Sequence, residues 1–354
     1  MSFRARFGFA SILFFAAAAP TLQAWDVDGH RMVNRFALEA LPRDFPDFVR
    51  SAPNAERIQQ LATVPDRWRN VDPYLRQSGG SWSDHFIDIE ELPRAGLDPR
   101  SVPSLRYNFV LLFAAGRVAY AEKFPAIDPA RNLDHVREWP GFAPWAIAEH
   151  FHRLRSAFGY LKAYEDLGGT PDEIANAKAD VVYAMGVIGH YVGDCAQPLH
   201  TTLNYNGWAS ENPNGYTTWN GLHSWMDSGF INKAGLTFAN IAARVAPVSP
   251  LDLSPRKDGR DPFFVATMDY ILTQWDQVEP LYRLEKTGLL GNGDRPITAE
   301  ARTFFEGQLV RGGTMLAQVW LSAWKSAPID TFLRTRLGER AAGGAKPSRE
   351  KNTK

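Results

Sequence analysis

Apolar residues recur every three or four positions over several long segments of this chain, a spacing that places them on one face of an α-helix. The pattern predicts helices over residues 31–41, 55–61, 105–121, 144–168, 262–286 and 298–327. We expect the helix over 105–121 to belong to the core. No segment shows the period-two alternation of a half-buried strand, and no repeat or linker divides the sequence. The pattern therefore predicts an all-α fold with a single compact multi-helix domain.

One further helix is marked by its first residues. Thr170 and Glu173 have the spacing of a capping box, and Pro171 stands at the first helical position. This helix should continue to about Cys195, because Pro198 does not allow another turn. A loop rich in asparagine, glycine and aromatic residues follows, and another helix is expected to open over 221–227.

Both ends of the chain differ from the helical region. Residues 1–24 combine two arginines, an apolar run and a small residue at position 24, which is the pattern of a signal peptide. The apolar run is too short for a spanning helix, so we expect a secreted or periplasmic protein with no stable membrane anchor. The mature domain would comprise residues 25–337, and the polar, glycine-rich segment 338–354 is expected to be a disordered tail.

Composition limits the possible partners. Hydrophobic residues make up 45% of the 354 residues, which is ample for a large core. Without the two arginines of the signal segment, the formal charge is about −2. No strong overall field would attract a polyanion, so any affinity for nucleic acid must be local. Cys195 is the only cysteine, which excludes an intramolecular disulfide, and we interpret it as a small buried apolar residue.

The stretch 189–200, GHYVGDCAQPLH, places potential metal ligands close together. His190 and Asp194 are four residues apart and therefore share one face of the predicted helix. His200 follows after the helix has ended. Glycines at 186, 189 and 193 leave little bulk beside this face. The stretch is thus suited to holding a cluster of cations inside a helical protein.

Other parts of the sequence supply similar groups. His223 and Asp227 repeat the four-residue spacing. Asp66 and Arg69 are three apart, so one can face a metal while the other reaches an anion, although a surface ion pair is the alternative. Cleavage after residue 24 would expose the α-amino group of Trp25 as a ligand.

Taken by itself, His30 is better interpreted as an ordinary histidine in the first turn of a helix. The complete set of candidate ligands is Trp25, His30, Asp66, His85, His190, Asp194, His200, His223 and Asp227. Imidazole and carboxylate ligands without thiolate suit zinc in a hydrolytic site. Nine ligands are too many for one ion and about right for three. Clustered zinc ions lower the pKa of bound water and stabilise both oxygens of a phosphoryl displacement.

Together these motifs resemble the S-one/P-one family of trinuclear-zinc nucleases from fungi and plants, whose superfamily includes the bacterial zinc-dependent phospholipases C. The resemblance extends from Trp25 to Asp227 and implies a fold of the phospholipase C/nuclease type. It implies that one zinc is held by Asp66, His85, His190 and Asp194. Asp194 would bridge to a second, completed by His30 and the amino and carbonyl groups of Trp25. His200, His223 and Asp227 would hold the third.

The resemblance also implies roles in catalysis, in which Asp66, Asp194 and Arg69 would take part. A hydroxide between the first two zinc ions would attack phosphorus, and Arg69 would neutralise charge on the phosphate. Phe86 and Asp88 would stack on and hydrogen-bond to the base of a single-stranded nucleic acid or nucleotide. No protein partner is indicated.

The sequence departs from the nucleases after the third histidine. They usually carry Asp-x-Gly-Gly-Asn there, whereas this chain has NYNGW and a longer polar loop over 201–221. Asp227 and Arg69 favour a nuclease, because the phospholipases tend to have glutamate and no such arginine. A phospholipase C that cleaves phospholipid headgroups is therefore the alternative. A non-catalytic, zinc-stabilised binding protein is a further one, which the absence of sulfur ligands disfavours.

Overall fold

Helix α8 (Pro171–Ala196) runs through the centre of the molecule. The computed structural model describes residues 25–72, 74–75, 82–133 and 135–343. The predicted capping box is confirmed: the Thr170 hydroxyl accepts from Glu173 N at 3.2 Å, and the Glu173 carboxylate accepts from Thr170 N at 2.7 Å. Every residue of α8 from Met185 onward is buried. Its last three turns therefore place their side chains inside the protein.

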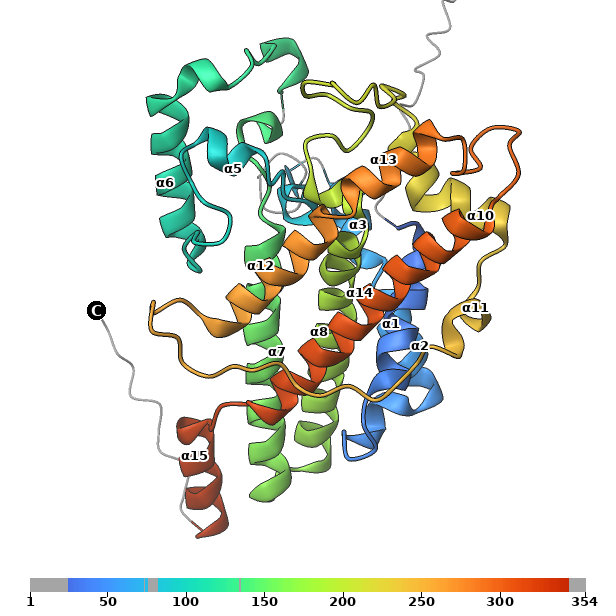
Figure 1. Cartoon of the computed structure of the whole chain (residues 1–354). Helices are drawn as coiled ribbons and strands as arrows, with labels where there is room; N and C mark the ends of the chain where they lie inside the picture. Colours follow the sequence, from blue (N-terminus) through green and yellow to red (C-terminus); the bar gives the residue numbers. More distant parts are fainter. Residues whose placement is uncertain (1–24, 73, 76–81, 134, 344–354) are drawn as a thin grey trace, which may run out of the picture.

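Four helices surround α8 (Figure 1). They are α7 (Ala143–Asp166), α1 (Val27–Ala40), α2 (Ala52–Leu61) and α14 (Ala299–Lys325). Helix α14 also packs on α1 and α7, and α12 (Pro262–Trp275) packs on α7. The fold is thus an all-α, multi-helix domain with α8 as its core helix.

Aromatic side chains fill the spaces between these helices. Phe151 of α7 and Phe263 of α12 stack with ring centroids 3.5 Å apart. Trp320 of α14 is fully buried, and its indole Nε1 donates to the carbonyl oxygen of Met185 at 3.1 Å. Burial of side chains of this size is the main stabilising contribution to such a fold, at roughly 1.5–3 kcal/mol each.

Shorter elements lie around this core. The other α-helices are α3 (Val64–Val71), α5 (Glu91–Arg94), α6 (Arg106–Ala119), α9 (Leu222–Ser224), α10 (Phe230–Ala234), α11 (Phe238–Ala242), α13 (Val278–Lys286) and α15 (Thr331–Ala341). The 3₁₀ turns are η1 (Asp47–Arg50), η2 (Ser83–His85), η3 (Ala121–Lys123), η4 (Pro129–Arg131), η5 (Val136–Glu138) and η6 (Pro198–Thr201). A π-helical turn, η7 (Trp225–Gly229), follows α9. Within the described residues, β pairing is limited to two isolated bridges.

The predicted helix over 262–286 is wrong in its extent, because the chain forms two helices there. Helix α12 ends at Trp275 and α13 begins at Val278. The sequence does carry a signal of this break, because Pro280 stands in the first turn of α13, and a proline is tolerated there but not inside a continuous helix. Both helices bury apolar residues with the same period, so the apolar pattern by itself continues across the turn and gives no signal of it.

The prediction that 105–121 belongs to the core is also wrong. Only Phe109, Phe113 and Gly116 of α6 are buried. Tyr107 and Val118 are 85% and 82% exposed. This helix is apolar on nearly all sides, and Figure 1 shows it at the edge of the molecule. Periodicity identifies its packed face but does not reveal that the opposite face has no cover.

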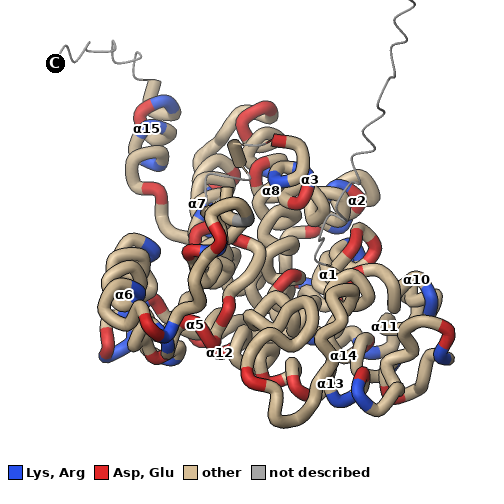
Figure 2. Tube along the Cα trace, turned by 90° about the horizontal axis from the view of Figure 1, so that it is seen from above, with Lys and Arg blue, Asp and Glu red and all other residues tan. Residues whose placement is uncertain are grey.

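The expected start of the polar tail needs correction, since α15 continues through Gly338 to Ala341. Arg340 makes an ion pair with Glu173 at 2.9 Å, which holds the end of α15 at the start of α8. The predicted signal segment 1–24 and residues 344–354 lie outside the described residues. No helix in the described part of the chain is long and apolar enough to cross a membrane. Figure 2 shows basic and acidic residues interspersed over the outer elements, in keeping with the near-zero net charge.

Candidate metal centre

Seven elements, α8 among them, place the predicted ligands around the end of α8. His190 and Asp194 come from α8, and His30 comes from α1. The others are Asp66 on α3, His85 on η2, His200 on η6, His223 on α9 and Asp227 on η7. All eight side chains are buried. The structure therefore brings together ligands that are far apart in the sequence.

Two glycines of α8 allow the neighbouring helix α1 to approach closely. A Cβ at Gly189 would lie 2.0 Å from the side-chain oxygen of Asn34, and one at Gly193 would lie 2.9 Å from His30 Nδ1. The space that the sequence suggested for ions is thus used largely for helix packing. Gly193 nevertheless contributes to the site, because it admits the His30 ring beside Asp194.

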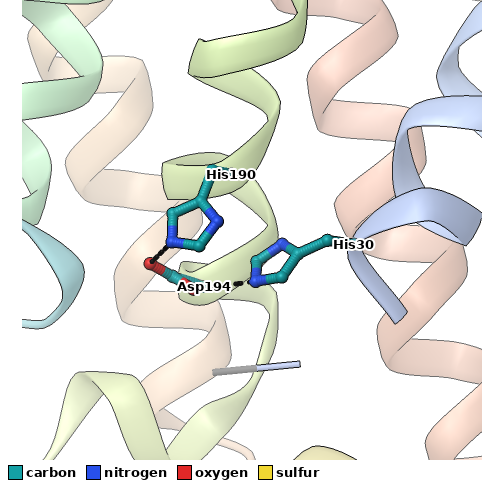
Figure 3. Close-up of side chains that lie close together, drawn as sticks. All are labelled: His30, His190 and Asp194. Atoms are coloured by element: carbon teal, nitrogen blue, oxygen red, sulfur yellow. Dashed lines mark ion pairs between the residues drawn. The ribbon is translucent and has the colours of Figure 1, made fainter. Parts of the chain in front are cut away.

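The two carboxylate oxygens of Asp194 face different histidines (Figure 3). Oδ1 is 3.3 Å from His30 Nε2, whereas Oδ2 is 3.2 Å from His190 Nε2 and 2.9 Å from His85 Nδ1. Ligand atoms around a tetrahedral zinc are roughly 3.3 Å apart, given bonds of about 2.0–2.1 Å. Asp194 therefore presents one carboxylate oxygen to His30 and the other to His190 and His85.

Asp66 completes the group on one side of Asp194. Its Oδ1 is 3.8 Å from His190 Nε2 and 3.9 Å from His85 Nδ1. The two histidine nitrogens are 2.8 Å apart. Candidate ligand atoms of Asp66, His85 and His190 all lie within 4.8 Å of one another, as do those of His30, His190 and Asp194.

A separate group is formed by His200, His223 and Asp227, again with ligand atoms within 4.8 Å. His223 Nε2 is 3.1 Å from Asp227 Oδ2. Both residues lie at the junction of α9 with the π-helical turn η7. The four-residue spacing places both side chains on one side of this helical segment.

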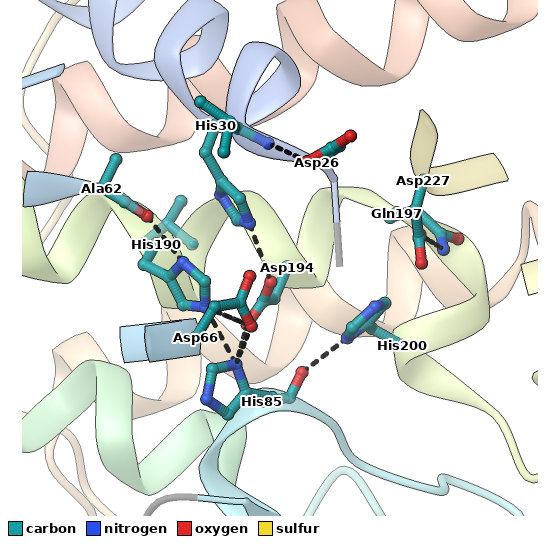
Figure 4. A network of polar contacts seen from close by, with 12 residues as sticks. Asp26, His30, Ala62, Asp66, His85, His190, Asp194, Gln197, His200 and Asp227 are labelled. Atoms are coloured by element: carbon teal, nitrogen blue, oxygen red, sulfur yellow. Dashed lines mark hydrogen bonds and ion pairs between the residues drawn. The ribbon is translucent and has the colours of Figure 1, made fainter. Parts of the chain in front are cut away.

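Backbone carbonyl groups orient three of the histidines, and Figure 4 shows two of these contacts, at His190 and His200. The Nδ1 atoms of His190 and His200 lie 2.6 Å and 2.7 Å from the carbonyl oxygens of Ala62 and His85. His223 Nδ1 makes a similar, longer contact of 3.3 Å with Tyr205. An Nδ1–H that donates to a carbonyl leaves Nε2 as the free, ligating nitrogen.

Several buried atoms at the centre make no hydrogen bond. They are His30 Nε2, Asp194 Oδ1, His200 Nε2 and Asp227 Oδ2. An unpaired buried polar atom costs about 1–3 kcal/mol, and such groups are uncommon in native proteins. Since the atoms are imidazole nitrogens and carboxylate oxygens, the residues fit divalent zinc.

Electrostatics differ between the two sides of the centre. Burial raises the pKa of Asp194, but the neighbouring His190, with the close His30 and His85 imidazoles, outweighs this effect and holds the pKa well below its ordinary value. Burial raises the pKa of Asp227 well above its ordinary value. Burial, together with His200, holds the pKa of His223 well below its ordinary value. The His223 imidazole is therefore in the neutral, ligating form.

Trp25 lies beside these groups. Its side chain is fully buried, and its ring contacts that of Phe305 edge to face. The next residue, Asp26, donates its backbone N–H to the carbonyl oxygen of Asp227 at 3.0 Å. The backbone of Trp25 is thus adjacent to the third group. His30, on the helix α1 that follows Trp25, reaches Asp194.

Arg69 is buried and not a surface residue, which removes the surface-pair alternative. It is only 4% exposed, and its Nη2 is 2.5 Å from Asp66 Oδ1. The guanidinium also lies over the Trp82 ring, 4.7 Å from its centroid. A fixed positive charge therefore stands beside a candidate metal ligand.

Phe86 and Asp88 follow His85 but belong to none of the three groups. Both are half-buried, and the Phe86 ring lies against Gly141. Burial, with Glu90 and Glu91, raises the pKa of Asp88 well above its ordinary value. Burial, with a smaller effect of Asp88, raises the pKa of Tyr205, whose ring contacts that of His223. Tyr205 therefore lies next to the third group.

Two supporting contacts were not predicted. Gln197 donates from Nε2 to Asp227 Oδ1 at 2.8 Å, and Asp84, next to His85, pairs with Arg106 of α6 at 2.7 Å. Gln197 could have been suspected from its position between Asp194 and His200. The contact of Asp84 with a residue 22 positions later has no local sequence signal. Cys195 is buried, as predicted, and it is not among the three groups.

No protein-family model matches this chain, and no curated protein matches it. The chemistry of the site is therefore inferred from its own geometry and from the resemblance of its motifs.

Proposed function

We propose that this protein is an exported, zinc-dependent phosphodiesterase that hydrolyses single-stranded DNA or RNA to 5′-nucleotides. The main support is the pair of Asp194 oxygens that face His30 on one side and His85 and His190 on the other. This arrangement suits a shared ligand between two zinc ions. Three bound zinc ions would supply an activated water and stabilise the leaving oxygen of the phosphodiester.

The protein's own residues would orient the substrate. The guanidinium of Arg69 is fixed by its contacts with Asp66 and the Trp82 ring. Its planar shape matches two oxygens of a phosphate. Because Arg69 is buried, its charge is weakly screened by water and favours the extra negative charge of the transition state. Asp88 and Tyr205 would border the leaving group next to His223.

A second candidate, hydrolysis of phospholipids, is favoured by one observation. Helix α6 exposes Tyr107, Leu111 and Val118 on its outer surface, and exposed apolar patches of this kind mark interaction sites. Its first residue, Arg106, is tied to Asp84 beside the ligand His85. An apolar helix surface connected to the centre through this ion pair would suit a substrate held in a lipid interface.

The two candidates can be separated with one preparation of zinc-loaded protein. It would be assayed in parallel on single-stranded DNA, RNA and phosphatidylcholine, and bound zinc would be counted in the same sample. We expect about three zinc ions per chain and cleavage of oligonucleotides to products with 5′-phosphates. Three zinc ions without activity on any phosphodiester would instead support the non-catalytic binding protein.

A further inference from the structure

Gln197 is the first residue after α8 and is completely buried. It stands between Asp194, the last ligand on α8, and His200 on η6. Its backbone N–H donates to the carbonyl oxygen of Asp194, and its own carbonyl accepts from His200 N, each at 3.0 Å. The backbone of Gln197 thus joins two ligands of different groups.

The side chain of Gln197 links the same turn to a third ligand (Figure 4). Its Oε1 accepts from the backbone N–H of Leu199 at 2.6 Å, and its Nε2 donates to Asp227 Oδ1 at 2.8 Å. The Leu199 contact fixes the orientation of the amide, because a backbone N–H can only donate and therefore requires the amide oxygen. A shorter amide or an apolar side chain could not make both contacts in this way.

This contact gives the two carboxylate oxygens of Asp227 different partners. Oδ1 is used by Gln197, whereas Oδ2 makes no hydrogen bond and lies 3.1 Å from His223 Nε2. The backbone of Asp227 is held as well, since its carbonyl accepts from Asp26 N at 3.0 Å. The carboxylate is therefore fixed with one defined oxygen toward His223.

We propose that Gln197 is a positioning residue for the third metal ion. It orients Asp227 and makes occupation of the His200–His223–Asp227 group depend on the folded end of α8. The inference rests on the metal centre of the proposed function but not on its substrate. Contacts behind a metal ligand commonly change metal affinity by roughly 10–100-fold.

The test is a metal count on Gln197→Met, which keeps an unbranched side chain of similar size without the hydrogen bonds. Gln197→Asn, which retains an amide one methylene shorter, is a second variant. Gln308→Met is the matched control, because Gln308 is also fully buried and its hydrogen-bond partner is Arg311. Asp227→Asn provides the reference for loss of the third ion. Zinc per chain is measured after dialysis against metal-free buffer, and cobalt(II) titration followed by absorption gives the affinity of each site.

We expect Gln197→Met to keep two ions and to bind the third roughly 10–100-fold more weakly, as Asp227→Asn does, while the control binds three. Gln197→Asn should lie between wild type and Gln197→Met. Three ions bound with wild-type affinity would overturn the proposal, as would the joint loss of all three in both Gln197 variants. Wild-type protein with three ions and no phosphodiesterase activity would contradict the proposed function while leaving this inference intact.

Discussion

His200 Nδ1 lies 2.7 Å from the backbone carbonyl oxygen of His85, so a residue of one metal group orients a ligand of another. The side chain of His85 plays no part in this contact. Its ring nitrogen instead faces Asp194 Oδ2 at 2.9 Å. The same residue therefore serves one group through its side chain and the other through its backbone.

This division predicts the outcome of His85→Asn. The variant loses the imidazole that faces Asp194 but keeps the carbonyl that orients His200. We expect it to lose zinc from the group of Asp66, His85 and His190 and to retain the ion of the His200 group. Zinc analysis and cobalt(II) spectra measure this, and loss of all bound metal would contradict it.

Asp194→Asn should abolish turnover and lower the zinc content. An amide presents one oxygen and one N–H₂ group, so it cannot offer an acceptor oxygen to His30 on one side and to His85 on the other. The matched control is Asp172→Asn, an exposed aspartate in the first turn of the same helix. Kinetics and zinc analysis on both proteins decide the matter, and three zinc ions in Asp194→Asn would exclude the bridging role.

Arg69→Ala separates substrate binding from metal binding. We expect zinc content to be retained and turnover to fall by about 10²–10³, the usual cost of losing a contact that strengthens in the transition state. Arg67→Ala is the control, because Arg67 is an exposed arginine of the same helix. Some stability should also be lost, since Asp66 would have no guanidinium partner. Wild-type turnover on oligonucleotides and phospholipid would show that Arg69 does not contact phosphate.

An added residue before Trp25 should impair one metal site. The Trp25 side chain is fully buried, and the backbone N–H of the following residue is hydrogen-bonded to Asp227. The segment around Trp25 therefore has little freedom to move. Extension also converts the proposed α-amino ligand into an amide, which binds zinc poorly. The measurement compares zinc content and turnover of a protein that begins at Trp25 with one carrying a stable extra alanine. Identical values would remove Trp25 from the ligand set.

The role of the exposed face of α6 in binding lipid can be tested by introducing negative charge there. Leu111→Glu combined with Val118→Glu should weaken binding to phosphatidylcholine vesicles by roughly tenfold or more, because the glutamates oppose insertion. Oligonucleotide hydrolysis should not change. The matched control places glutamate at Ile329 and Phe332, which lie outside α6 and are 75% and 74% exposed. Unchanged vesicle sedimentation of the α6 variant would remove the support for a phospholipid substrate.

The four-residue spacing of His190 with Asp194, and of His223 with Asp227, is local information, so the sequence could predict that the members of each pair lie together. The capping box at Thr170 was predictable for the same reason. The exposure of α6 was not, since periodicity reports that a face is apolar and not whether another element covers it. The break between α12 and α13 was predictable from Pro280 in the first turn of α13, but the apolar period continues across the turn and hides it.

The supporting contacts depend on tertiary structure. Asn34, which fits against Gly189 and donates to the carbonyl oxygens of Ile58 and Gly186, joins three helices that the sequence treats separately. The ion pair of Asp84 with Arg106 likewise appears only when α6 is placed beside η2. Pattern and spacing identify which residues can bind metal, whereas the partners that orient them come from the packing of helices.

The buried position of Cys195, next to Asp194, provides an internal reporter of the metal centre. Burial raises the pKa of its thiol well above the usual value, so the reactive thiolate is scarce and shielded in the folded protein. A thiol reagent can therefore modify the chain only when the end of α8 opens. The labelling rate measures how often that happens, and with a single cysteine each molecule carries one signal. Saturation with zinc should slow labelling in proportion to the stabilisation of this segment, without any substrate being present.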